Sequence, residues 1–161
     1  MLLKLRLATI DDAKQVFLWR NNPWIVSLSS TQKQVTWEEH SAWFHNVVTS
    51  EQHLLLIIQT QLNVDAGIVR LDRTNKEQAG INIYLLQEFT GRRIGVQAIK
   101  KACDYGFEKW PITNMNAYIR QDNYPSISAF AKAGFVCVNP SLNCPSKHCE
   151  MTREKTVYSA Q

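Results

Sequence analysis

The sequence lacks the long apolar segments that mark membrane and secreted proteins. Its strongest apolar run, residues 54–58, is far shorter than the roughly 20 residues needed to span a bilayer, and it fits a buried strand instead. The first residues, Met1-Leu2-Leu3-Lys4, do not form the apolar core of a signal peptide. Internal repeats, low-complexity tracts and Gly/Ser linkers are also absent. We therefore expect one cytoplasmic domain over residues 1–161, without a membrane partner.

Cysteine is scarce, and none of the four cysteines forms a CxxC pair. The expected state is therefore free thiols in a reducing compartment. Cys144, His148 and Cys149 lie close together in the sequence, but a structural zinc site needs four suitably spaced ligands. We therefore expect no metal. Nothing in the sequence marks Cys103 or Cys137 as an activated nucleophile.

Charge of one sign is not concentrated anywhere in the chain. Lysine and arginine number 18 against 14 acidic residues, which leaves a formal net charge of +4. Because the basic residues are dispersed, we do not expect nucleic-acid binding, whereas a small anionic ligand suits this balance. Hydrophobic residues make up 45% of the chain, with 5 Trp, 5 Tyr and 6 Phe among them, so there is enough apolar material for a folded core.

Hydrophobic periodicity predicts an order of strands and helices. The expected strands cover residues 3–7, 53–60, 67–72, 78–86, 115–120, 135–138 and 149–156. The expected helices cover residues 10–21, 37–48, 94–109 and 125–134, with a short helical piece between the first two. The buried side of the first helix is expected to carry Ile10, Ala13, Val16 and Phe17. Thr36-Trp37-Glu38-Glu39 fits a capping box at the start of the helix over 37–48, and the helix over 94–109 is expected to carry Ile99, Ala102, Cys103 and Gly106 on one face. Short polar links between the three central strands indicate an antiparallel meander. The order β-α-α-β-β-β-α-β-α-β-β is that of a mixed α/β (α+β) domain.

A glycine-containing turn, Thr90-Gly91-Arg92-Arg93-Ile94-Gly95, lies between a predicted strand and a predicted helix. The first amides of a helix have no internal partner and the helix dipole is positive there, so such a turn binds anions. Gly95 would let a phosphate approach the backbone, and Arg92 and Arg93 add positive charge. Taken alone, these six residues are more typical of a solvated turn, and the P-loop pattern GxxxxGK[ST] is missing.

The wider sequence around this turn resembles a known family. The run from Tyr84 to Gly95 resembles the strand-to-helix cofactor segment of the GNAT N-acetyltransferase superfamily. Asn123-Tyr124-Pro125-Ser126-Ile127, followed by Lys132-Ala133-Gly134-Phe135, resembles its second cofactor motif. The resemblance covers residues 3–138 and implies the GNAT fold, with a mostly antiparallel central sheet of about seven strands flanked by helices, and acetyl-CoA as cofactor. In the family pattern Q/R-x-x-G-x-G/A, the first two signature positions fall on Thr90 and Arg93, and the third on Gly95.

The resemblance also implies which residues hold the cofactor. The fourth and fifth strands are expected to part after Tyr84, so that main-chain groups near Ile83–Leu86 pair with pantetheine. Amides from Arg92 to Val96 are expected to hold the pyrophosphate. The complete set of expected cofactor-binding residues is Ile83, Leu85, Leu86, Gly91, Arg92, Arg93, Ile94, Gly95, Val96, Asn123, Ser126 and Phe130.

The implied reaction is direct attack of a primary amine on the thioester. It needs a base for the amine proton and a donor for the leaving thiolate. Many family members place a tyrosine four residues before the Gly-Phe pair, but Phe130 occupies that position here. Tyr84, Tyr118 and Tyr124 are candidate substitutes, although each is more typical of an ordinary amphipathic core residue.

The N-terminal half resembles a narrower branch of the superfamily. Trp19–Pro23, Glu38–Phe44 and Gly67–Asp72 are similar to the sugar-nucleotide amine N-acetyltransferases of pseudaminic-acid-type pathways, and more distantly to ribosomal-protein N-acetyltransferases. Arg20 and Arg70 would then bind a diphosphate, while His40 would be a base or would contact the sugar. A half-buried packing role for His40 fits equally well.

Three functions remain open at this point. The favoured one is acetylation of an amino-sugar nucleotide. The alternatives are acetylation of a protein or peptide N-terminus, and a CoA-binding domain without catalysis. The resemblance is compatible with a homodimer.

Overall fold

The computed structural model describes residues 3–138 and 148–157. Within these residues, seven strands form one sheet in the order β1-β2-β3-β4-β5-β7-β6. Neighbouring strands run antiparallel, except that β4 and β5 are parallel. The strands are β1 (Lys4–Leu7), β2 (His53–Gln59), β3 (Asp65–Arg73), β4 (Gln78–Leu85), β5 (Asn114–Arg120), β6 (Val136–Cys137) and β7 (His148–Glu154).

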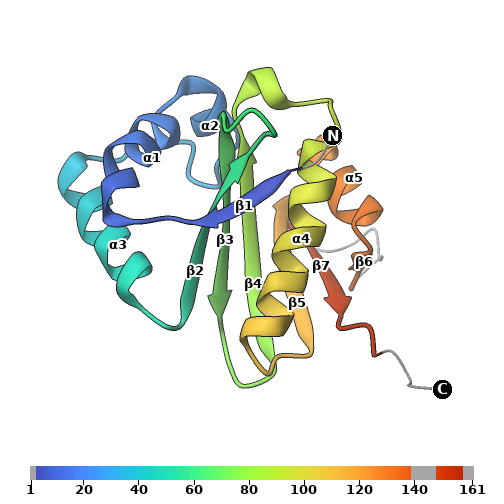
Figure 1. Ribbon diagram of the computed structural model, residues 1–161. Coiled ribbons are helices and arrows are strands. Elements are labelled where there is room, and N and C mark those ends of the chain that lie inside the picture. Colours follow the sequence, from blue (N-terminus) through green and yellow to red (C-terminus); the bar gives the residue numbers. More distant parts are fainter. Residues whose placement is uncertain (1–2, 139–147, 158–161) are drawn as a thin grey trace.

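Helices cover both faces of the sheet. Figure 1 shows α1 and α3 on one face and α4 and α5 on the other, with α2 near the end of the sheet where β4 finishes. The α-helices are α1 (Ala13–Arg20), α2 (Pro23–Leu28), α3 (Trp37–Thr49), α4 (Ile94–Lys109) and α5 (Tyr124–Lys132). Two 3-10 turns, η1 (Ile10–Asp12) and η2 (Gln87–Phe89), precede α1 and α4.

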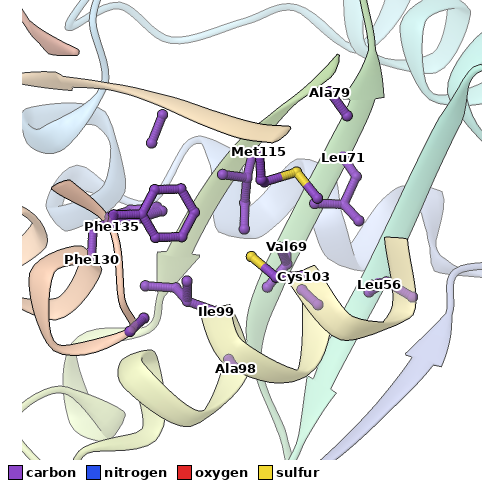
Figure 2. Packing of buried hydrophobic residues seen from close by; sticks show 14 of the residues in the cluster. Leu56, Val69, Leu71, Ala79, Ala98, Ile99, Cys103, Met115, Phe130 and Phe135 are labelled. Carbon is purple, nitrogen blue, oxygen red and sulfur yellow. The ribbon is translucent and has the colours of Figure 1, made fainter. Parts of the chain in front are cut away.

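The apolar run in β2 is explained by burial on both faces of the sheet. Leu54, Leu56 and Ile58 pack in the larger core under α4 and α5, whereas Leu55 and Ile57 pack in a smaller core under α1 and α3. Successive side chains of a strand point to opposite faces, so a strand covered on both sides must be apolar throughout. The predicted helix face at Ile99, Ala102, Cys103 and Gly106 lies in the larger core, part of which is drawn in Figure 2.

The predicted element order is confirmed, and α2 is the short helical piece expected between the first two helices. The predicted capping box is also present, because the Glu39 N–H donates to the Thr36 hydroxyl at 3.2 Å and the Thr36 N–H donates to the Glu39 carboxylate at 3.0 Å. The predicted buried face of the first helix is wrong at Ile10, which is 54% exposed, whereas Trp19 is buried. The first turn is a tighter 3-10 turn, which rotates Ile10 away from the core.

Candidate active site

A gap in the sheet opens between β4 and β5. Residues Gln78–Gly80 pair with Asn114–Asn116, and the pairing ends there. Beyond this point β4 follows its partner β3 as far as Leu85, and β5 follows β7 as far as Arg120. The sequence prediction placed the parting after Tyr84. The structure places it after Gly80, because each strand twists with a different antiparallel neighbour.

Main-chain groups of β4 face this gap at alternate residues. The Leu86 N–H donates to the Ala66 carbonyl at 2.9 Å, and the Thr74 N–H donates to the Gln78 carbonyl at 3.0 Å. The alternation of an antiparallel ladder therefore directs the even-numbered residues of β4 toward β3 and the odd-numbered residues toward β5. Ile83 and Leu85 thus present N–H and C=O groups to the gap, in the place expected for pantetheine.

The predicted main-chain role of Leu86 is corrected by the same ladder. Its N–H is used by Ala66, and its carbonyl accepts from the Phe89 N–H at 2.9 Å. The Leu86 N–H is therefore not available to a ligand, and its carbonyl keeps only one free lone pair. Ile83 and Leu85 are the better placed main-chain contacts, and a cofactor contact of Leu86 through its carbonyl or side chain stays a prediction.

The glycine-containing turn ends in a backbone shape suited to anions. Gly91 and Arg93 have φ angles of 73° and 61°, both in the left-handed region. Arg93 stands where the family pattern has glycine, and it adopts the left-handed conformation at a cost of about 1–2 kcal/mol. The side chains of Arg92 and Arg93 are exposed beside this turn.

The start of α4 supplies amides for a phosphate. Its first internal hydrogen bond runs from the Gln97 N–H to the Arg93 carbonyl at 3.2 Å. The N–H groups of Ile94, Gly95 and Val96 precede this bond, so they have no acceptor within the helix. A Cβ added to Gly95 would lie 3.5 Å from Leu85 Cδ1, which is ordinary contact. Gly95 therefore leaves the amides open to a ligand without being required by the fold.

The second cofactor segment forms the start of α5. The side-chain oxygen Oδ1 of Asn123 accepts from the Ser126 N–H at 3.3 Å and so caps the helix, which leaves the side-chain NH₂ group of Asn123 for a ligand. Phe130 is 2% exposed and packs edge-on against Phe135, with ring centroids 5.0 Å apart. This burial favours a structural role for Phe130. Tyr124 is 74% exposed.

Tyr84 points a buried hydroxyl into the smaller core. This oxygen has no hydrogen-bond partner among the described residues. Burial raises the pKa of Tyr84, and the positive charges of Arg20 and Arg70 oppose that rise. An unpartnered buried hydroxyl costs about 1–3 kcal/mol, so a ligand atom that bonded to it would recover this energy. The structure therefore places three predicted site residues, Tyr84, Arg20 and Arg70, in one region of the protein.

Arg70 is held in place by a small polar network on the same sheet face. Its Nε lies 2.8 Å from the Asp72 carboxylate, and His53 Nδ1 lies 2.6 Å from the other oxygen of that carboxylate. The guanidinium also lies over the Trp43 ring, 5.6 Å from its centroid. The Arg20 guanidinium, by contrast, donates to the Lys33 carbonyl at 3.2 Å. Both guanidinium groups are partly exposed.

His40 lies in an aromatic cluster with Phe17, Trp37, Trp43 and Phe44, and it is 3% exposed. Its Nε2 is 2.8 Å from the Ala13 carbonyl oxygen. Because a carbonyl only accepts, Nε2 carries the proton. Burial lowers the pKa of His40, although the hydrogen bond to Ala13 opposes this. The arrangement favours packing, and a catalytic role for His40 stays a prediction.

No group of three His, Cys, Asp or Glu side chains suited to a metal occurs in residues 3–138 and 148–157. Cys144, part of the zinc interpretation, lies outside the described residues. Cys137 and Cys149 lie on neighbouring strands with their sulfur atoms 3.7 Å apart. Across the described part of the chain, no helix combines the length and apolar character needed to cross a membrane.

Three residues near the site were not identified from the sequence. The Trp24 indole N–H on α2 is buried without a hydrogen-bond partner among the described residues. Arg120, at the end of β5, contacts the end of α2. Gly67 on β3 lies against the backbone of Tyr84. Only Gly67 carried a local signal, because a glycine inside a strand indicates a close backbone approach.

The structure combines a sheet that opens after Gly80, unpaired main-chain amides at the start of α4 and a capped α5. This is the arrangement expected of an acyl-CoA-binding fold. The family model of the acetyltransferase (GNAT) domain matches residues 3–136. The chain belongs to this family, so it is an acetyltransferase that uses acetyl-CoA.

Individual relatives are more distant. Acetyltransferase PseH from Campylobacter jejuni is 22% identical over 126 residues, which cover 78% of this chain and 77% of that protein. A domain from Methanocaldococcus jannaschii has a TM-score of 0.81 at 22% identity and covers 96% of this chain and 99% of its own. Spermidine N-acetyltransferase from Vibrio cholerae, in complex with CoA and spermine, has a TM-score of 0.81 at 17% identity over 94% of this chain and 95% of its own. These structural likenesses show the shared fold alone.

Proposed function

We propose that this acetyltransferase acetylates a primary amine on a small anionic acceptor, with an amino-sugar nucleotide as the favoured acceptor. The observation that carries the proposal is the unpartnered Tyr84 hydroxyl, which lies on the sheet face that also carries Arg70 and close enough to Arg20 for both positive charges to oppose the rise in its pKa. Two guanidinium groups beside one hydroxyl suit a ligand that combines a diphosphate with sugar oxygens. The similarity to acetyltransferase PseH and the resemblance of Trp19–Pro23 to the sugar-nucleotide branch also support it.

The cofactor half of the proposal rests on main-chain groups. The N–H groups of Ile94, Gly95 and Val96 would bind the pyrophosphate, and the exposed Arg92 and Arg93 side chains would add positive charge. Asn123 and Ser126 stay proposed contacts of the pantetheine arm.

The chemical step would take place beside β4. An N–H of Ile83 or Leu85 would donate to the thioester carbonyl as negative charge develops on its oxygen. One such preorganised donor is typically worth ~3 kcal/mol in the transition state. The amine nitrogen attacks the carbonyl carbon, the carbon–sulfur bond breaks, and the amine proton leaves through a base or solvent.

Tyr84 is the best placed donor for the departing thiolate or for the acceptor. Its raised pKa keeps the hydroxyl protonated at neutral pH, so it acts as a hydrogen-bond donor and not as a base. Phe130 lacks a proton to give and lies in the core. Tyr124 keeps its place as a proposed catalytic residue, but its exposed position on α5 makes it the weaker candidate.

The second candidate function is acetylation of a protein or peptide N-terminus, favoured by the more distant resemblance to ribosomal-protein N-acetyltransferases. A peptide would need room along the exposed polar face of β5, where Tyr118 donates to Glu150 at 3.2 Å. The cytoplasmic location and a homodimer stay predictions.

A thiol-release assay with acetyl-CoA and a panel of amines separates these functions. The panel contains an amino-sugar nucleotide, the same amino sugar without its nucleotide, a polyamine and an N-terminal peptide. We expect release with the nucleotide-linked sugar and much weaker release with the free sugar. Exclusive release with the peptide would overturn the proposed acceptor. Acetyl-CoA binding without turnover of any amine would leave only the non-catalytic alternative.

A further inference from the structure

Arg120 connects β5 to α2 at the open end of the sheet. It is the last residue of β5, on the side of the gap that also carries α5. Its Nη1 donates to the Ser27 carbonyl at 3.0 Å and to the Ser29 carbonyl at 3.4 Å. Ser27 lies in α2 and Ser29 caps its C-terminal end, so these bonds cross from the cofactor side to the helices of the acceptor side.

These bonds have a clear local cause. The last carbonyls of a helix have no partner within it, and cationic side chains are favoured at that end. α2 has only six residues, so it contributes little stability of its own and depends on contacts with its surroundings. Arg120 supplies such a contact from a residue 93 positions away in the sequence from Ser27.

The segment after α2 is tied down on its other side by Asn21. The Asn21 side chain accepts from the Val35 N–H and donates to the Val35 carbonyl, both at 2.8 Å. Residues 23–35 therefore form a flap that Asn21 and Arg20, through the Lys33 carbonyl, hold to α1 and that Arg120 holds to β5. Inside the flap, the Trp24 indole N–H is buried and has no hydrogen-bond partner among the described residues. A ligand could accept a hydrogen bond from this group.

We propose that Arg120 is a positioning residue for the acceptor, acting through α2. Arg120 fixes the flap at the open end of the sheet. The part of the flap that contacts the acceptor is thereby held at a fixed distance from the thioester. The inference rests on the proposed function, because it assumes that the acceptor lies beside Arg20 and the start of the flap. Arg120 itself is not a catalytic residue, since its guanidinium is occupied by main-chain carbonyls and by Asp122.

Arg120→Ala tests this proposal, with Arg120→Lys as a partial replacement. Lysine keeps the charge but lacks the fork that reaches two carbonyls at once, so it should restore part of the effect. Asp122→Asn is the matched control, because it removes the ion pair of Arg120 and leaves both bonds to α2. Asp122 is exposed, so this change should not affect folding.

The first readout is the rate at which trypsin cuts after Lys33, an exposed residue of the flap, followed by mass spectrometry. We expect faster cutting in Arg120→Ala, an intermediate rate in Arg120→Lys, and the wild-type rate in Asp122→Asn. This measurement does not depend on which amine is the acceptor. If cutting after Lys33 is no faster in Arg120→Ala, Arg120 does not hold the flap and the proposal fails.

The second readout is the division of the effect between the two substrates. For whichever amine is acetylated, we expect the acceptor KM to rise about tenfold in Arg120→Ala, because acceptor binding would then have to order a flap that a charge-assisted hydrogen bond within the protein no longer holds. The Kd of acetyl-CoA should stay at the wild-type value. Equal weakening of both substrates would indicate general loosening of the fold and would overturn the positioning role. If no amine is acetylated, the proposed function fails, while the trypsin rates still decide whether Arg120 holds the flap.

Discussion

Gly67 on β3 and Tyr84 on β4 approach so closely that a Cβ on Gly67 would lie 2.2 Å from the Tyr84 carbonyl oxygen. Gly67 also has a φ of 156° and lies where the pairing of β2 with β3 shifts register, after Ile58. The close approach presses β3 against the part of β4 that carries Tyr84, Ile83 and Leu85. The geometry of the proposed site therefore depends on a residue that touches no substrate.

Gly67→Ala should destabilise the protein and disturb the site. The added methyl collides with backbone that cannot rotate away, and overpacking of this kind typically costs about 1–3 kcal/mol. In a chain of this size, that loss lowers Tm by roughly 2–4 °C per kcal/mol. Gly80→Ala is the matched control on β4, because its Cβ would meet its nearest atoms at 3.9 Å. Equal Tm values for the two variants in a thermal melt would contradict the close-approach argument.

Gly95→Trp should abolish acetyl-CoA binding while the fold persists. The indole would cover the amides at the start of α4, where the pyrophosphate is proposed to bind. Gly95→Ala is the control, because its methyl group meets only Leu85 at 3.5 Å and should leave binding close to wild type. Isothermal calorimetry with acetyl-CoA measures both variants. A wild-type Kd in Gly95→Trp would show that the start of α4 is not the phosphate site.

Features set by neighbouring residues could be predicted from the sequence, and features set by long-range pairing could not. The Thr36–Glu39 cap and the buried face of α4 depend on spacings of three or four residues, and both were predicted. Which residues of β4 face the gap depends on its register with β3, so the sequence did not separate Leu86 from Ile83 and Leu85.

Two further features also needed the three-dimensional arrangement. The Tyr84 hydroxyl is left without a partner by the packing of α1 and α3 on the sheet. The contact of Arg120 with α2 joins residues that local patterns cannot relate. In the same way, the position of Ile10 depends on whether the chain starts α1 with a 3-10 turn.

His40→Phe should change the pH dependence of stability more than the rate of catalysis. Burial lowers the pKa of His40 below its ordinary value of 6.5, so the unfolded chain binds a proton that the folded protein resists. The stability contributed by neutral His40 is therefore complete above pH 6.5 and is lost as the pH falls through the lower, folded-state pKa.

Urea unfolding at pH values on both sides of 6.5 measures this loss. The free energy of unfolding of His40→Phe should fall less at acid pH than that of the wild type. At neutral pH it should be about 1 kcal/mol lower than the wild-type value, because the bond to Ala13 is lost. Its kcat should stay near wild type. A fall in kcat by about 10²–10⁴-fold, without loss of fold, would instead identify His40 as a general base.

Tyr84→Phe should raise stability and lower activity together. The substitution removes a buried hydroxyl that has no partner among the described residues, so the free energy of unfolding should stay the same or rise by about 1 kcal/mol. If the hydroxyl donates to the acceptor or to the departing thiolate, turnover should fall by at least about tenfold. Tyr118→Phe is the control, because that hydroxyl is exposed and already bonded to Glu150, and its loss should change neither quantity much. A higher free energy of unfolding together with a lower kcat in Tyr84→Phe would show that the hydroxyl serves the reaction and not the packing of the core. Unchanged turnover of the acceptor in that variant would remove the Tyr84 hydroxyl from the mechanism. β4 would then contribute to the reaction through its main-chain groups alone.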